Sequence, residues 1–229
     1  MTNDFSSCDS AAISVYFLRM ATLVLVRHGL SEYNKIGIWA GWEDPALAPE
    51  GYEQAQRTGK ELSDIHFDHA YTSDQIRSEQ TLSEIKKQIN QESIPTTINR
   101  AFRERNYGDY NHKNKWDVKK EVGEEEFQKI RRSWDYPPPN GESLKMVHDR
   151  VVPYYEEEVL PKLKSGLNIL VASSGNALRA LVKHLENIPD EKVADLEIGT
   201  GEAYVYTVNT EGTITNKEIR GENENRGKV

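Results

Sequence analysis

The 229-residue sequence has a single cysteine, Cys8, and little positive charge. One thiol can form neither an internal disulfide nor a cysteine-based zinc site. Apolar runs are too short to span a membrane, and there is no internal repeat. Lys and Arg number 29 against 37 Asp and Glu, a formal net charge of -8. Because nucleic acids and anionic membranes bind basic faces, we expect neither as a partner. The single cysteine suits a reducing cytosol, so we expect a cytoplasmic protein.

The length is that of one domain, which we place at residues 21–220. Residues 1–20 are rich in Ser, Asn and Asp and lack the positive start of a secretory signal, so they are expected to be a disordered extension. Residues 221–229 are polar and are expected to form a flexible tail. The start of the working protein stays open between Met1 and Met20.

The most informative segment is an apolar run at 22–26 that ends abruptly in a polar sequence, Arg27-His28-Gly29. Such a run is typical of a buried strand. Ligands of open α/β sheets lie at the carboxyl ends of strands, so Arg27 and His28 are expected to face a crevice that suits an anion. Gly29 is expected to let the backbone approach a ligand closely. An isolated Arg-His pair is also compatible with an ordinary surface position.

Three other segments carry candidate functional groups. Arg77 is expected in the first turn of a helix, where a cation opposes the helix dipole unless it is solvated or an anion lies nearby. Glu104 stands between two arginines and is followed by Tyr107, and surface ion pairs are the simplest explanation for this group. The strand-turn-helix sequence around Gly175-Asn176 predicts an anion site formed by free backbone N–H groups.

The expected elements alternate along the chain. Helices are predicted at 49–63, 74–88, 113–134, from 142 onward, and from the turn at Gly175-Asn176 to about 186. The further strands are predicted at 69–73, 95–98, 166–172, 204–208 and 213–219. Ser73 is expected to cap the helix at 74–88, and Pro153 to kink or interrupt the helix that begins at 142.

Several motifs in register resemble the histidine phosphatase superfamily, and most closely its cofactor-dependent phosphoglycerate mutases. The resemblance runs from about residue 22 to 208. It implies an α/β fold, a three-layer α/β/α sandwich with a mostly parallel central sheet, with which the expected elements agree. The motifs that carry it are R-H-G-x-S-x-x-N from Arg27, Gly41-Trp42, the segment from Thr72 to Arg77, E-R-x-Y-G from Glu104, Asn114-Lys115, R-R-S-W-D from Arg131, and Gly175-Asn176.

The resemblance implies a role for each matching residue. His28 would be the phosphate-accepting nucleophile, Arg27 and Arg77 would hold the phosphoryl group, and Glu104 would move the proton of the substrate hydroxyl. It implies 2,3-bisphosphoglycerate as the primer, 3- and 2-phosphoglycerate as substrates in glycolysis and gluconeogenesis, and no metal. The implied substrate-binding residues are Asn34, Gly41, Arg105, Tyr107, Lys115, Arg131, Arg132, Gly175 and Asn176.

The sequence departs from the family most notably at Ser174, where a second active-site histidine is usual. Losing one well-placed donor costs on the order of 3 kcal/mol, or about a hundredfold in rate. Leu30, Ala40 and Asn106 are milder departures. Two alternatives therefore stay open: a phosphatase of the same superfamily, and a phosphoglycerate-binding protein with impaired catalysis. Many relatives carry an additional segment between the proline run and the Glu-Ser-Leu motif, and here Pro139-Asn140-Gly141-Glu142 joins the two directly. The resemblance therefore implies a monomer or weak oligomer.

Overall fold

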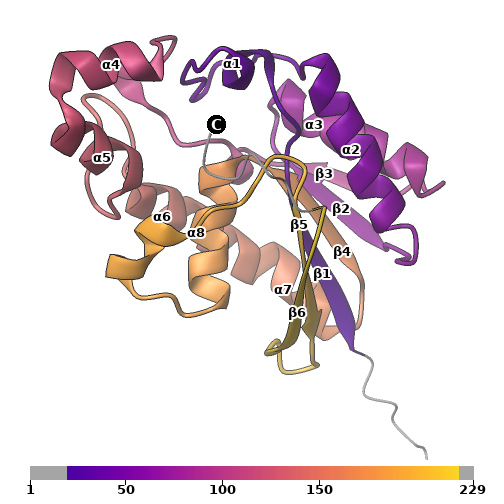
Figure 1. The fold of residues 1–229 in the computed structure, drawn as a ribbon. Coiled ribbons are helices and arrows are strands. Elements are labelled where there is room, and N and C mark those ends of the chain that lie inside the picture. The colour runs from indigo at the N-terminus through magenta and orange to yellow at the C-terminus, as the bar shows by residue number, and fades with distance from the viewer. Residues whose placement is uncertain (1–19, 222–229) are drawn as a thin grey trace, which may run out of the picture.

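The computed structural model describes residues 20–221 and contains one mixed six-stranded sheet (Figure 1). The predicted extension and tail lie outside the described residues, apart from Met20 and Gly221. In spatial order β3-β2-β4-β1-β5-β6, the first four strands are parallel and β5 is antiparallel to both of its neighbours. The strands are β1 (Ala21–Arg27), β2 (His69–Thr72), β3 (Thr96–Ile98), β4 (Ile169–Ser173), β5 (Ala203–Val208) and β6 (Ile214–Arg220).

Helices cover both faces of the sheet, which confirms the expected α/β/α architecture. Figure 1 shows α2 and α3 on one side and α6 and α8 on the other. The short α1 and the pair α4 and α5 lie beyond one end of the sheet. The helices are α1 (Glu32–Lys35), α2 (Pro49–Glu61), α3 (Ile76–Gln88), α4 (Lys115–Val122), α5 (Glu124–Arg132), α6 (Leu144–Tyr154), α7 (Leu160–Lys164) and α8 (Gly175–Leu185).

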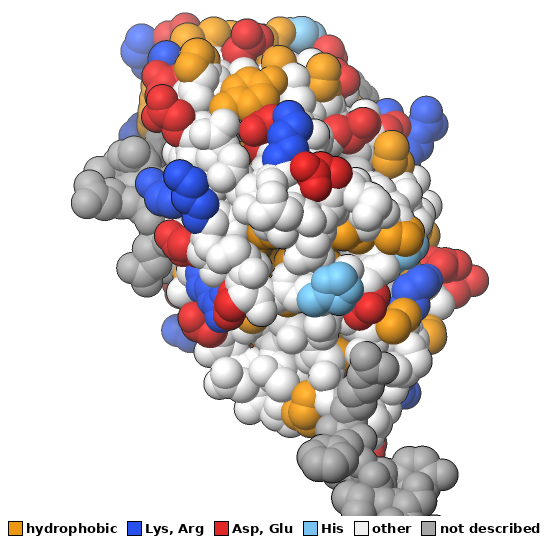
Figure 2. All heavy atoms as spheres, turned by 90° about the vertical axis from the view of Figure 1, so that its right-hand side faces the viewer, with side chains coloured by type: hydrophobic (Ala, Val, Ile, Leu, Met, Phe, Trp, Pro, Cys, Tyr) orange, Lys and Arg blue, Asp and Glu red, His pale blue; other side chains and the backbone are white. Residues whose placement is uncertain are grey.

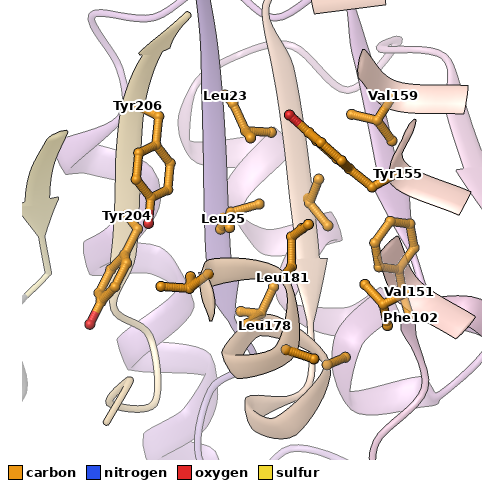
Figure 3. Packing of buried hydrophobic residues seen from close by; sticks show 14 of the residues in the cluster. Leu23, Leu25, Phe102, Val151, Tyr155, Val159, Leu178, Leu181, Tyr204 and Tyr206 are labelled. Carbon is orange, nitrogen blue, oxygen red and sulfur yellow. The ribbon is translucent and has the colours of Figure 1, made fainter. Parts of the chain in front are cut away.

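Strand β1 is central because alternate side chains enter two different hydrophobic clusters. Leu23 and Leu25 pack with residues of α6 and α8, including Val151 and Leu178 (Figure 3). The intervening residues of β1, Val24 and Val26, join the cluster under α2 and α3. A strand buried on both faces reads as a continuous apolar run. This packing fixes the position of the polar residues that follow β1.

Three expectations about helices need correction. Ser73 does not cap α3: the residue before the helix is Gln75, whose side chain makes no capping bond. The helical region predicted at 113–134 is two helices, because Gly123 has a φ of +82° and ends α4. Pro153 is accommodated within α6, and the interruption follows as a wide π-type turn at Tyr155–Val159. Proline removes one N–H donor, and such turns relieve the mismatch.

A third hydrophobic cluster joins α4 and α5 to the rest of the domain. Trp39 stacks on Tyr107 with ring centroids 4.9 Å apart, and Phe127 of α5 also packs against the indole. These aromatic contacts hold the two helices beside the carboxyl end of β1. Trp39 therefore has a packing role, and it also contributes to the lining of the pocket described below.

The outer face that carries α2 and α3 has mixed charge. Figure 2 shows acidic and basic side chains interspersed on this face. Within residues 20–221, no helix is both long and apolar enough to cross a membrane.

Candidate active site

His28 lies at the carboxyl end of β1 and is only 3% exposed. Its Nδ1 is 2.7 Å from the carbonyl oxygen of Gly29. A carbonyl only accepts, so Nδ1 carries the proton and Nε2 keeps a lone pair. Burial, followed by the charges of Arg77 and Arg27, lowers the pKa of His28 well below its ordinary value. The imidazole is therefore neutral near pH 7, as a nucleophile must be.

Gly29 is required by the packing of the chain itself. A Cβ at this position would overlap the backbone of Gly51 in α2, and Gly51 in turn lies against the backbone of Leu30. The close approach is therefore between two segments of this chain. It brings the loop after β1 against α2.

Two arginines flank the imidazole, of which Arg27 is half-buried and Arg77 is buried. Arg27 donates from Nη1 to the carbonyl of Ile198 at 2.7 Å, and in the described part of the chain its buried Nε has no acceptor. Arg77 donates to the carbonyls of Glu43 and Gly41 at 2.8 and 3.1 Å. Burial lowers the pKa of both arginines, and the Glu104 carboxylate opposes that shift. Arg77 is thus a buried cation, and the solvated alternative is wrong.

Glu104 reaches the same pocket from the loop after β3. Its Oε1 accepts hydrogen bonds from the backbone N–H of Arg105 and from Nδ2 of Asn176, both at 2.7 Å. Its carbonyl accepts from Trp42 and from Arg150, each at 3.0 Å. A carboxylate held this firmly is well placed to exchange a proton with a substrate hydroxyl.

Asn176, in the first turn of α8, links three polar groups. Arg179 donates to its Oδ1 at 2.9 Å, which sets the orientation of the amide. Its Nδ2 then donates to Glu104 and, at 3.1 Å, to the hydroxyl oxygen of Tyr107. Because that oxygen accepts from Asn176, the phenolic proton can be donated to a ligand.

Helices α4 and α5 supply the other cations. Lys115 begins α4 and is 6% exposed. Burial, then the charges of Arg131 and Arg27, lowers its pKa to about 7. Burial and Arg132 also lower the pKa of Arg131. Cations crowded in this way favour binding of an anion, which removes their repulsion.

The pocket encloses about 690 Å³, including the part open to solvent. Its lining combines six cationic side chains with two carboxylates, in a protein whose net charge is negative. Among the predicted residues, the lining includes Arg27, His28, Asn34, Gly41, Arg77, Glu104, Tyr107, Lys115, Arg131, Arg132, Gly175 and Asn176. Within residues 20–221, no group of three or more His, Cys, Asp or Glu is arranged to hold a metal ion.

Arg105 is the predicted substrate-binding residue that does not line the pocket. It is fully buried, donates to the carbonyl of Ile130 at 2.9 Å and lies 4.5 Å from the ring centroid of Tyr107. It therefore supports the end of α5, where Arg131 and Arg132 follow. The alternation of charges in the sequence could not show which of Arg103 and Arg105, the neighbours of Glu104, is directed into the protein interior.

Sequence reasoning missed several contributors to the pocket. Arg179 and Glu197 line the pocket, with Glu197 paired to Arg132. Ile198 also lines it, and Gln75 lies behind it with only 1% of its surface exposed. None belongs to a local charge pattern, and only the folded chain brings them to the site. Ser174 is fully buried behind the lining, and its hydroxyl donates to Gln75 Oε1 at 3.2 Å.

This arrangement of a neutral histidine, buried arginines and a carboxylate at a sheet edge matches the sequence comparisons. The model of the histidine phosphatase superfamily (branch 1) matches residues 23–218, and the chain belongs to that superfamily. Within it, the chain belongs to the family of the cofactor-dependent phosphoglycerate mutases, as its curated relatives establish.

One such relative is the 2,3-bisphosphoglycerate-dependent phosphoglycerate mutase of Parvibaculum lavamentivorans. It is 43% identical over 204 residues, which cover 88% of this chain and 97% of the relative. The enzyme of the same name from Rhizobium meliloti is 43% identical over 203 residues, covering 88% and 96%. Among solved structures, a phosphoglycerate mutase from Bacillus anthracis has a TM-score of 0.73 at 25% identity, covering 89% of this chain and 94% of that one.

Proposed function

We propose that this protein interconverts 3-phosphoglycerate and 2-phosphoglycerate in glycolysis and gluconeogenesis, with His28 as the phosphohistidine and 2,3-bisphosphoglycerate as primer. The observation that carries the proposal is a second set of cations, Lys115, Arg131 and Arg132, which line the same pocket as Arg27 and Arg77. A simple phosphatase needs one phosphoryl site. A ligand with an additional phosphate or carboxylate also needs the second set.

The residues fit the primer. Arg27 has a buried, unpartnered Nε within the described chain, and six cations line the pocket. A ligand with two phosphates and one carboxylate matches this charge. When bound, 2,3-bisphosphoglycerate supplies the phosphoryl group that His28 accepts. Arg27 and Arg77 then neutralise the phosphoryl oxygens during transfer.

The proposed chemistry uses His28 and Glu104 in turn. A substrate hydroxyl attacks phosphorus, the bond to Nε2 of His28 breaks, and Glu104 takes the hydroxyl proton. In the reverse sense Nε2 attacks phosphorus, and Glu104 returns the proton to the leaving oxygen. The Nδ1–H bond to the Gly29 carbonyl keeps Nε2 available in both directions.

The decisive experiment is an enolase-coupled assay on 3-phosphoglycerate with and without 2,3-bisphosphoglycerate. Turnover that requires the primer supports the mutase. Release of inorganic phosphate as the main product would instead support the phosphatase, and binding without turnover would support the impaired binding protein. We also propose a cytoplasmic monomer or weak oligomer, which cell fractionation and light scattering would test.

The low pKa of Lys115 predicts proton uptake on binding. At a pKa of about 7, about half of the free protein carries this proton at pH 7. A bound anion raises this pKa, so the contribution of Lys115 to the affinity for 3-phosphoglycerate is fully present below pH 7 and is lost as the pH rises through the free and then the bound pKa. Calorimetry at pH 7 in two buffers of different ionisation enthalpy should measure the uptake of about half a proton by this lysine when the ligand binds.

Lys115→Met is expected to remove this component of the uptake, whereas titration of the ligand phosphate continues in both proteins. Lys120→Met is the matched control, since Lys120 lies on the same helix, is exposed and pairs with Asp117. Equal proton uptake by wild type and Lys115→Met would contradict the assignment.

Glu197 is expected to weaken ligand binding. Its carboxylate pairs with Arg132 inside the pocket, so an anionic ligand must displace it or accept its repulsion. We expect Glu197→Gln to lower the dissociation constant of 3-phosphoglycerate about three- to tenfold in calorimetry. Glu191→Gln is the control, because Glu191 is exposed in the short 3-10 helix that precedes Glu197, and it should bind as wild type does. Weaker binding by Glu197→Gln would show that the carboxylate instead organises the site.

A further inference from the structure

The buried side-chain amide of Gln75 links two segments of the pocket, one at Gly41 and one at Glu104. Gln75 precedes α3, is 1% exposed and makes no helix cap. Its Nε2 donates to the Gly41 carbonyl at 2.9 Å, and its Oε1 accepts from the Glu104 N–H at 2.8 Å. The two backbone partners allow one orientation only, because a carbonyl must face the amide nitrogen and an N–H must face the amide oxygen.

The partners of Gln75 are directly connected to the reacting groups. The Gly41 carbonyl also accepts from Nη2 of Arg77 at 3.1 Å. Glu104 is the proposed proton carrier. One amide therefore ties the segment that orients a phosphoryl-binding arginine to the segment that carries the carboxylate.

Ser174 completes this arrangement. Oε1 of Gln75 can only accept, so the Ser174 hydroxyl donates to it at 3.2 Å. The neighbouring residue, Ser173, anchors the same turn by donating to the Phe102 carbonyl at 2.7 Å. Ser174 is fully buried and, within the described chain, does not line the pocket. Its hydroxyl is therefore directed at the amide, and this is a positional role.

We propose that Gln75 is a positioning residue for phosphoryl transfer, which aligns Glu104 and Arg77, and that Ser174 acts on catalysis through Gln75. The proposal rests on the proposed function. A displacement of about 1 Å at a reacting group can cost about a hundredfold in rate. Loss of the Gln75 amide is thus expected to lower kcat, whereas Lys115 and Arg131 should still bind the ligand.

The test is a double-mutant cycle of Gln75→Leu, Ser174→Ala and the double variant, assayed for primer-dependent turnover per folded molecule. We expect Gln75→Leu to lower kcat about 10- to 100-fold and Ser174→Ala about three- to tenfold. In the Gln75→Leu background, Ser174→Ala should have no further effect. Affinity for 3-phosphoglycerate in calorimetry should stay within about twofold, which separates positioning from loss of binding.

Gln80→Leu is the matched control for a merely structural glutamine. Gln80 lies on α3 and accepts from the Leu47 N–H at 2.9 Å, so its loss should reduce stability while kcat stays unchanged. Equal effects of Ser174→Ala in both backgrounds would mean that Ser174 acts without Gln75 and would overturn the proposal. An unchanged kcat in Gln75→Leu would do the same.

Hydrogen exchange at the Glu104 amide keeps this test separate from the proposed function. The amide should exchange at least about tenfold faster in Gln75→Leu than in wild type or Gln80→Leu, because its acceptor is lost. If wild type shows no mutase turnover, the proposed function fails. The exchange rate still tests the alignment of Glu104 by Gln75, because equal rates in wild type and Gln75→Leu would overturn it.

Discussion

Replacing His28 with alanine is expected to lower turnover of 3-phosphoglycerate by at least about 10⁴-fold, because the covalent route loses its nucleophile. Arg27 and Arg77 remain, so 3-phosphoglycerate should still bind. The measurement is the enolase-coupled assay, together with transfer of labelled phosphate from 2,3-bisphosphoglycerate to the protein. Wild type should form an acid-labile phosphoprotein, and His28→Ala should form none.

The matched control for this variant is His66→Ala. His66 is exposed, and its removal should change neither turnover nor labelling. Residual activity of His28→Ala above about a hundredth of the wild-type rate would contradict the phosphohistidine route. Labelling that persists in His28→Ala would place the nucleophile elsewhere.

Glu104→Gln is expected to lower kcat by about 10²- to 10⁴-fold. Glutamine preserves the shape of the side chain, and its amide oxygen can still accept from Asn176 and from the Arg105 N–H. What is lost is the ability to take up and return a proton. Affinity for 3-phosphoglycerate should stay equal or increase, because a negative charge leaves a pocket that binds anions. Steady-state kinetics and calorimetry separate these two effects.

Glu121→Gln provides the control for removal of a carboxylate, because Glu121 is exposed on α4. It should retain wild-type kcat. A kcat of Glu104→Gln within about tenfold of wild type would mean that another group carries the proton.

Local patterns in the sequence were sufficient for most elements. The apolar run before Arg27, the apolar run that became β4 and the spacing in α8 all predicted structures that the fold confirms. These signals work because burial on one or two faces leaves a periodic record in the chain. They were misleading at Ser73, where the chain continues two residues before α3 begins, and at Gly123, where a positive φ ends a helix.

The pocket was predictable only where a motif lay within one segment. His28 with Arg27 follows a single strand, and Asn176 follows another. Arg105 was misplaced because adjacent charged residues point to opposite sides of a loop, and the choice depends on what packs behind them. The Ile130 carbonyl accepts from Arg105 in this protein, across 25 residues of sequence.

The sequence by itself determined the order of strands and helices along the chain, the family, and the residues proposed to bind a phosphoryl group, because these depend on local periodicity and contiguous motifs. Only the tertiary structure decided that His28 keeps Nε2 free, that Lys115 has a pKa of about 7, and that Gln75 joins Glu104 to Ser174. Tautomer, desolvation and hydrogen-bond partners depend on groups that are distant in the chain. Folding brings those groups within a few ångströms of one another.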